Sequence, residues 1–194
     1  MSEHRLTRAD TIASDSAFAD LWVTARSRAS GFKDKLGRGM DPGIIDTVTA
    51  FLLLGFGTLS SCEGHPERPR TAPKISLFFP EPVIIKPELD RDALLAARAP
   101  IEALLGAFNH ERPAGPQRIA AVSLTSQDTF IGVIVASESY RPNYDGASTC
   151  TLVDQQQEML SLTDFMVERA LSQFLATEPA DRRPFRLKSV DVHE

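Results

Sequence analysis

DPGIIDTVTAFLLLGFG, residues 41–57, leads directly into TLSSCEGHP, residues 58–66. Asp41 is a typical helix N-cap, and Pro42 suits the first helical position, where its missing N–H needs no partner. The following residues are apolar on most sides, which predicts a central helix covered by other elements. Either of its last two glycines can end it. The next residues, TLSS, then predict a short extended segment that delivers the loop at Cys62.

Around this centre, the remaining patterns predict a mixture of helices and strands. Helical apolar spacing occurs at residues 16–29, 89–111 and 154–177, and strand patterns occur at 74–79, 118–125 and 129–137. Pro100 is expected to kink or split the second of these helices. The order favours an α+β two-layer sandwich, in which about four helices pack on a small, mostly antiparallel sheet.

The length of 194 residues suits one domain with a sizeable core. We expect that single α+β domain at residues 12–178. Residues 1–11 are polar and predict a flexible N-terminus, and residues 179–194 predict a polar C-terminal tail.

Charge and composition argue against some partners. The net charge of −5 makes nucleic acid an unlikely partner, because phosphate binding needs clustered Lys and Arg. The chain shows neither a signal peptide nor an apolar run of ~20 residues, so we expect no membrane partner. Its two cysteines, Cys62 and Cys150, lie far apart and do not form a disulfide framework, which favours a cytoplasmic protein with free thiols. The oligomeric state and any cofactor stay open.

The densest group of reactive side chains lies in the loop at Cys62, and one interpretation is catalytic. Cys62 would be a nucleophilic or redox thiol, with His65 three residues further on as its partner. An imidazolium beside a thiol favours the thiolate, which is the nucleophilic form. Glu63, or a carboxylate from elsewhere in the chain, would orient the imidazole.

A second interpretation is a metal site, because Cys62 and His65 supply zinc ligands at a spacing that a turn can close. A structural zinc site needs four ligands. The others would come from Cys150, His110, His4 or a carboxylate.

Two further interpretations leave Cys62 without a chemical role. The hydroxyls of Ser60 and Ser61 and the amides around Gly64 could bind a cofactor, an anion or another small-molecule ligand. Alternatively, the protein is a non-enzymatic binding or interaction module, in which the loop is structural and Cys62 is a small packed side chain.

The order of an apolar helix, GFGTLSSCEGHP and a strand near PKISL resembles a group of bacterial proteins without an assigned activity. That group carries a T-x-x-S-C-E-G-H segment and a helical EM…T-x-F segment, which Glu158, Met159, Thr163 and Phe165 match here. The resemblance covers residues 41–175 in the order of elements, and the cysteine loop is its specific part. This chain differs by the insertion PERPRTAP between loop and strand.

The loop is also similar to that of the tRNA wybutosine-synthesising methyltransferase family known as TYW three. There, a T-x-S-S-C-S-G-R segment likewise leads into a strand. The matching residues here are Thr58, Ser60, Ser61, Cys62 and Gly64, and His65 stands in place of the arginine. The resemblance implies a loop that helps to bind S-adenosylmethionine or RNA. We interpret it as a shared loop design rather than a shared function.

Overall fold

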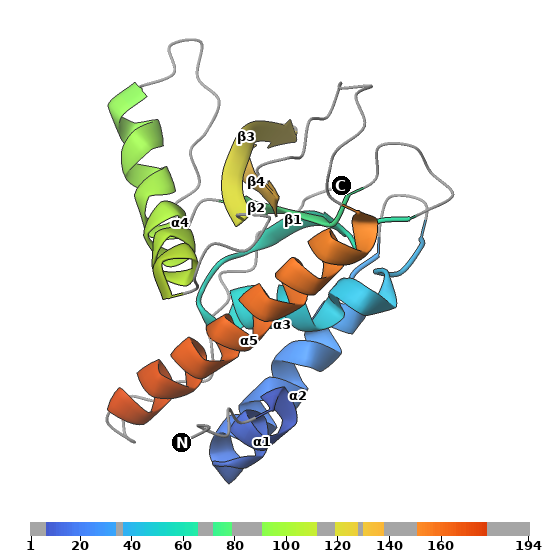
Figure 1. Cartoon of the computed structure of the whole chain (residues 1–194), viewed down its shortest axis with the longest axis vertical. Coiled ribbons are helices and arrows are strands. Elements are labelled where there is room, and N and C mark those ends of the chain that lie inside the picture. Colours follow the sequence, from blue (N-terminus) through green and yellow to red (C-terminus); the bar gives the residue numbers. More distant parts are fainter. Residues whose placement is uncertain are drawn as a thin grey trace.

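A computed structural model describes residues 7–33, 37–65, 72–78, 91–111, 119–127, 130–137 and 151–177. Their elements are α1 (Arg8–Ala13), α2 (Ser16–Ser30), the short 3₁₀-helix η1 (Pro42–Ile44), α3 (Ile45–Leu53), β1 (Thr58–Cys62), β2 (Lys74–Phe78), α4 (Arg91–Glu111), β3 (Ile119–Gln127), β4 (Phe130–Ser137) and α5 (Leu152–Ala176) (Figure 1). None of the helices in these ranges is both long and apolar enough to cross a membrane.

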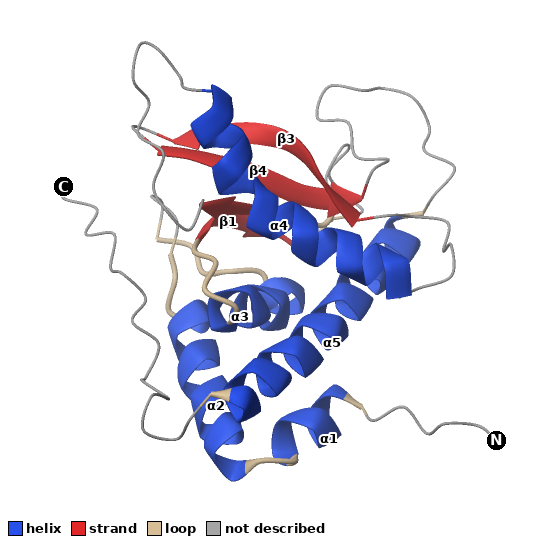
Figure 2. Ribbon diagram, turned by 90° about the vertical axis from the view of Figure 1, so that its left-hand side faces the viewer, coloured by secondary structure: helices blue, strands red, loops and turns tan. Residues whose placement is uncertain are grey.

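The four strands form one sheet in the order β1-β2-β4-β3, and every neighbouring pair is antiparallel. Figure 2 shows this sheet as one layer and the helices as the other. Ile75 and Leu77 of β2 are fully buried in the core, and their partners on β4 are Val135 and Val133. The α+β class and the small antiparallel sheet packed by helices are therefore confirmed.

Helix α3 is central, as its apolar sequence predicts, because every residue from Thr47 to Leu53 is buried. It ends in a Schellman motif at Gly55, whose φ of +86° favours glycine. The amide of Phe56 donates to the carbonyl of Phe51 at 2.9 Å, and the amide of Gly55 donates to the carbonyl of Leu52 at 3.0 Å. The rings of Phe51 and Phe56 also meet edge to face, with centroids 6.0 Å apart. This ending turns the chain into β1.

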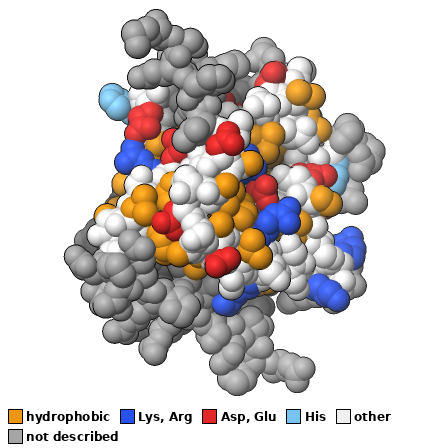
Figure 3. Space-filling model, turned by 90° about the horizontal axis from the view of Figure 1, so that it is seen from below, with side chains coloured by type: hydrophobic (Ala, Val, Ile, Leu, Met, Phe, Trp, Pro, Cys, Tyr) orange, Lys and Arg blue, Asp and Glu red, His pale blue; other side chains and the backbone are white. Residues whose placement is uncertain are grey.

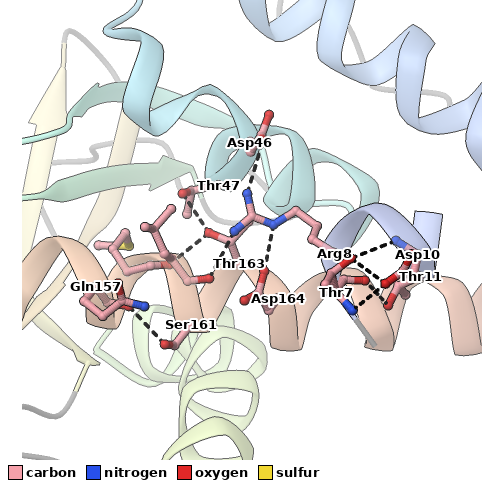
Figure 4. A network of polar contacts seen from close by, with 12 residues as sticks. Thr7, Arg8, Asp10, Thr11, Asp46, Thr47, Gln157, Ser161, Thr163 and Asp164 are labelled. Carbon is pink, nitrogen blue, oxygen red and sulfur yellow. Dashed lines mark hydrogen bonds and ion pairs between the residues drawn. The ribbon is translucent and has the colours of Figure 1, made fainter. Parts of the chain in front are cut away.

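The N-terminal prediction is wrong for residues 8–11, which belong to α1. Thr7 and Asp10 form a capping box there, and the hydrogen bonds from Thr7 lower the pKa of the Asp10 carboxyl. Arg8 then joins α1 to two other helices: it lies 2.7 Å from Asp164 of α5 and 3.0 Å from Asp46 of α3 (Figure 4). These ion pairs attach α1, whose sequence is polar, to α3 and α5.

Two further segments bear on the sequence predictions. Helix α4 runs through Pro100 as one element, so of the two predicted effects, a kink or a split, the split is wrong. The hairpin of β3 and β4 is confirmed, with Gln127 paired to Phe130 at its closed end. The predicted tail at 179–194 lies outside the described residues.

Figure 3 shows one face of the molecule from below. Apolar side chains gather near its centre, with acidic and basic side chains among and around them. Leu175 and Val23 are among the exposed large apolar residues, with exposed fractions of 51% and 64%. This face does not carry charge of a single sign, because red and blue side chains alternate across it.

A buried hydroxyl pair joins α3 to α5. Thr47 and Thr163 are both fully buried, and their Oγ1 atoms lie 2.8 Å apart. Thr163 also donates to the carbonyl of Met159 at 2.9 Å. Because a hydroxyl has one proton, Thr47 must be the donor in the pair.

We expect Thr163→Val to destabilise the fold by about 1–3 kcal/mol, because it leaves the Thr47 donor buried without its acceptor. Thr47→Val should cost less, since Thr163 keeps its bond to Met159. Urea unfolding of both single variants and the double variant measures this. A double variant as unstable as the sum of the single variants would contradict the pairing.

Candidate functional site

The first half of the site is the loop that follows β1. Cys62 is the last residue of the strand, and the chain then turns at Gly64, which is buried and has a φ of +84°. This backbone conformation favours glycine. The amide of Gly64 donates to Cys62 Sγ at 3.4 Å. The turn leaves His65 on the same side of the structure as Cys62.

The second half is Asp41, immediately before η1. Asp41 occupies the N-cap position that the sequence predicts, but its side chain makes no capping hydrogen bond. Its Oδ2 instead accepts the amide of Glu63 at 3.3 Å and lies 3.2 Å from Nε2 of His65. The Glu63 amide and the His65 imidazole therefore contact the carboxylate that would otherwise cap the helix.

Asp41, Cys62 and His65 thus converge. One oxygen, sulfur or nitrogen atom from each side chain lies within 4.8 Å of the other two, and all three residues are partly buried. The side chains of His65 and Asp41 have exposed fractions of 18% and 30%, so the group is open to solvent on one side. Among the residues that the structure describes, this is the one group of three or more such side chains.

The shape of the group distinguishes two kinds of chemistry. In a nucleophile–base–acid relay, the acid and the nucleophile bind opposite nitrogens of the imidazole. Two hydrogen bonds of about 3 Å and the ring between them then separate the acid from the nucleophile by roughly 6 Å or more. Here, Asp41 oxygen and Cys62 sulfur lie within 4.8 Å. The three side chains form a triangle around a common point rather than a line.

Glu63 does not take the position predicted for it beside the imidazole. Its Oε2 accepts the amide of Gly43 at 2.6 Å, and its backbone carbonyl accepts Nε2 of Gln156 from α5 at 3.1 Å. Asp41 is the carboxylate beside His65. Glu63 therefore ties the cysteine loop to the turn that carries Asp41.

The predicted donors for a cofactor or an anion are dispersed. Ser60 and Ser61 are neighbours on a strand, so their side chains point to opposite faces. The Ser60 hydroxyl donates to Ser76 Oγ at 3.0 Å. The amides of Glu63 and Gly64 are directed to Asp41 and Cys62. These amides do not form an open anion-binding nest.

Of the other predicted histidine and cysteine ligands, His110 lies among the described residues, and it does not join the group. His110 lies exposed in the last turn of α4 and is absent from the cluster of ligand atoms. His4 and Cys150 lie outside the described residues.

Sequence reasoning missed Asp41 as a member of the site, although its position carried a signal. The three residues of η1 and nine of α3 rise by roughly 20 Å, and the five residues of β1 return by roughly 17 Å. When a strand follows a helix of similar length and runs back beside it, the end of the strand lies close to the start of the helix. Asp41 and Cys62 occupy those two positions.

Comparison with known proteins adds no relative: no family model, curated protein or solved structure matches the chain. The resemblances of the cysteine loop to the bacterial group and to the TYW three family therefore stay predictions. The functional argument depends on the geometry of the site.

Proposed function

We propose that this protein binds a divalent transition metal ion, with Zn²⁺ as the first candidate, through Asp41, Cys62 and His65. One observation carries the proposal: the three ligand atoms lie within 4.8 Å of one another around a common point. The proposal keeps the two zinc ligands predicted from the sequence and adds Asp41, in the turn before η1, as the carboxylate ligand.

The donor set supports zinc over harder ions. Thiolate and imidazole are ligands that Zn²⁺ prefers, whereas Mg²⁺ and Ca²⁺ take oxygen ligands. Zn–S bonds of ~2.3 Å and Zn–N and Zn–O bonds of ~2.0–2.2 Å place tetrahedral ligands roughly 3.5 Å apart. The His65–Asp41 separation of 3.2 Å is near this value.

Three protein ligands leave the fourth tetrahedral position open, as in catalytic zinc centres. A metal held there supplies a Lewis acid for a bound water or carbonyl. The chain's own contribution is to hold the ligands: the amide of Gly64 donates to Cys62 Sγ, and the amide of Glu63 donates to Asp41. A small-molecule ligand would occupy the open position.

The proposal includes a cytoplasmic location. Thiolate ligation requires a reduced Cys62, and a reducing compartment maintains that state. The two cysteines, far apart in sequence, fit the same location.

Cobalt titration tests the proposal, because Co²⁺ in a tetrahedral site with a sulfur ligand gives intense visible bands and a sulfur-to-metal charge-transfer band. We expect one equivalent to bind with both features, and Zn²⁺ to displace it. A spectrum no different from that of Co²⁺ in buffer, together with no Zn²⁺ retained after dialysis, would overturn the proposal.

Metal affinity should fall as the pH is lowered. Protons compete with the ion for the Cys62 thiolate and the His65 imidazole, so the apparent affinity should change by about tenfold per pH unit for each proton displaced. Calorimetry in two buffers of different ionisation enthalpy counts the protons released. Binding without proton release between pH 6 and 8 would contradict ligation by these side chains.

The Gly64–Cys62 contact favours a second candidate, a reactive thiol, because an amide that donates to sulfur also stabilises a nucleophilic thiolate. Alkylation followed by mass spectrometry separates the two functions, with Cys150 as the internal control. Protection of Cys62 that a chelator relieves supports the metal site. Fast labelling that neither zinc nor a chelator changes supports the reactive thiol.

A further inference from the structure

Glu63 contacts two separate segments, the turn at residues 41–43 and helix α5, with three different groups. Its amide donates to Asp41, its carboxylate accepts the amide of Gly43, and its carbonyl accepts the side chain of Gln156. Two of these contacts join the residue next to Cys62 to the turn that contains Asp41. They determine how far apart these two ligands lie.

We infer that Glu63 is a positioning residue of the metal site, which sets its affinity and geometry without touching the ion. This inference rests on the proposed function. Glu63 is absent from the group of converging ligand atoms, and its Oε2 is held 2.6 Å from the amide of Gly43. Hydrogen-bond partners behind metal ligands orient them, and their loss typically weakens metal binding by ~10–100-fold.

The close approach at Gly43 shows how specifically this contact is built. A Cβ atom at Gly43 would lie 2.5 Å from Oε2 of Glu63, nearer than real Cβ contacts allow. An added Cβ atom therefore requires the end of the Glu63 side chain to move. Any larger residue at position 43 would push the Glu63 side chain away from the amide.

The contact also explains why Asp41 is available. A carboxylate is favourable beside the first amides of a helix, where the backbone dipoles leave positive charge. Glu63 fills that role at Gly43 from another segment. Asp41, which the sequence predicts as the cap, is then directed towards His65.

The test compares Co²⁺ affinity and spectra of the full-length protein with those of three variants. Glu63→Ala should weaken binding by about 10–100-fold and change the visible spectrum, because it removes the carboxylate that ties the cysteine loop to Gly43 and leaves only the backbone amide on Asp41. Glu63→Gln keeps an acceptor oxygen for Gly43 and should retain the wild-type spectrum and nearly the wild-type affinity. Glu102→Ala, which removes a half-exposed glutamate of α4, is the control and should bind as the wild type does.

Gly43→Ala supplies a test that general destabilisation cannot imitate. With Glu63 present, it should weaken binding about as much as Glu63→Ala does, because the added methyl group displaces the carboxylate. With alanine at position 63, the same change should cost nothing further, since no carboxylate is left to displace. If Glu63→Ala does not fold, the comparison of Glu63→Gln with Gly43→Ala still decides whether the contact between Glu63 and Gly43 sets the metal affinity.

The outcomes are distinguishable. A wild-type protein that binds no metal overturns the proposed function, and this inference with it. Wild-type binding with unchanged affinity in Glu63→Ala and Gly43→Ala overturns the inference alone. Additive losses in the double variant also overturn it, because they would mean that the two residues act independently.

Discussion

Replacing Cys62 with alanine is expected to abolish stoichiometric zinc binding. The thiolate is the only sulfur in the converging group, and its loss leaves one imidazole and one carboxylate. The loss of affinity should exceed the ~10–100-fold that removal of an outer hydrogen-bond partner costs. Competition with a chromophoric chelator measures it. The charge-transfer band of the Co²⁺ protein should disappear in the same variant.

Cys150→Ala is the matched control, since it removes the other thiol of the chain. It should keep one equivalent of metal and the charge-transfer band. Asp41→Asn should weaken binding while keeping that band, because the sulfur ligand is intact. A Cys62→Ala protein that retains its zinc would refute ligation by this thiol.

Replacing Phe51 with alanine should destabilise the fold by about 3–5 kcal/mol. Phe51 is fully buried in α3, and its ring packs edge to face on Phe56. Its carbonyl also accepts the amide of Phe56 in the motif that ends the helix. Truncation therefore leaves a cavity at the point where the chain turns towards the site. Guanidinium unfolding at equilibrium measures the loss.

Val23→Ala is the control for this experiment, because Val23 is 64% exposed. Its effect should stay within about 0.5 kcal/mol. A Phe51→Ala protein of wild-type stability would contradict the central position of α3. A lower free energy of unfolding with normal metal binding in the folded protein would show that the ring supports the fold rather than the site.

The sequence was a good guide wherever neighbouring residues decide the structure. The apolar run of α3 predicted its burial, and alternating apolar residues predicted β2 and the hairpin of β3 and β4. Gly55 was one of two predicted helix ends, and the structure places the motif there. These features depend on local backbone preference and on a simple apolar period.

Features that depend on distant partners were not predictable in this way. The polar start of the chain indicated a flexible end, yet Arg8 finds carboxylates on α3 and α5. Pro100 predicted a break, and α4 continues through it because a proline costs a helix stability without forbidding it. At the start of the chain, these ion pairs outweigh the local preference.

The candidate site shows the same division. Cys62 and His65 were found because they are three positions apart in the sequence, with a turn-forming glycine between them. Asp41 was assigned to a cap because the sequence alone does not show that the amides of a later loop compete for it. Glu63 was assigned to the imidazole for the same reason, and its contact with Gly43 becomes visible only when the two segments are placed together.

The placement of the site within residues 41–65 has a consequence for the order of folding. Its contacts are short in sequence, whereas the sheet is completed by pairs such as Lys74 with Ala136. Segments of low contact order close with a smaller loss of chain entropy and therefore form sooner. The helix–strand unit that carries Asp41, Cys62 and His65 can assemble before the strand order is complete. An ion bound there would act on the nascent chain as a local nucleus, and not only on the finished protein.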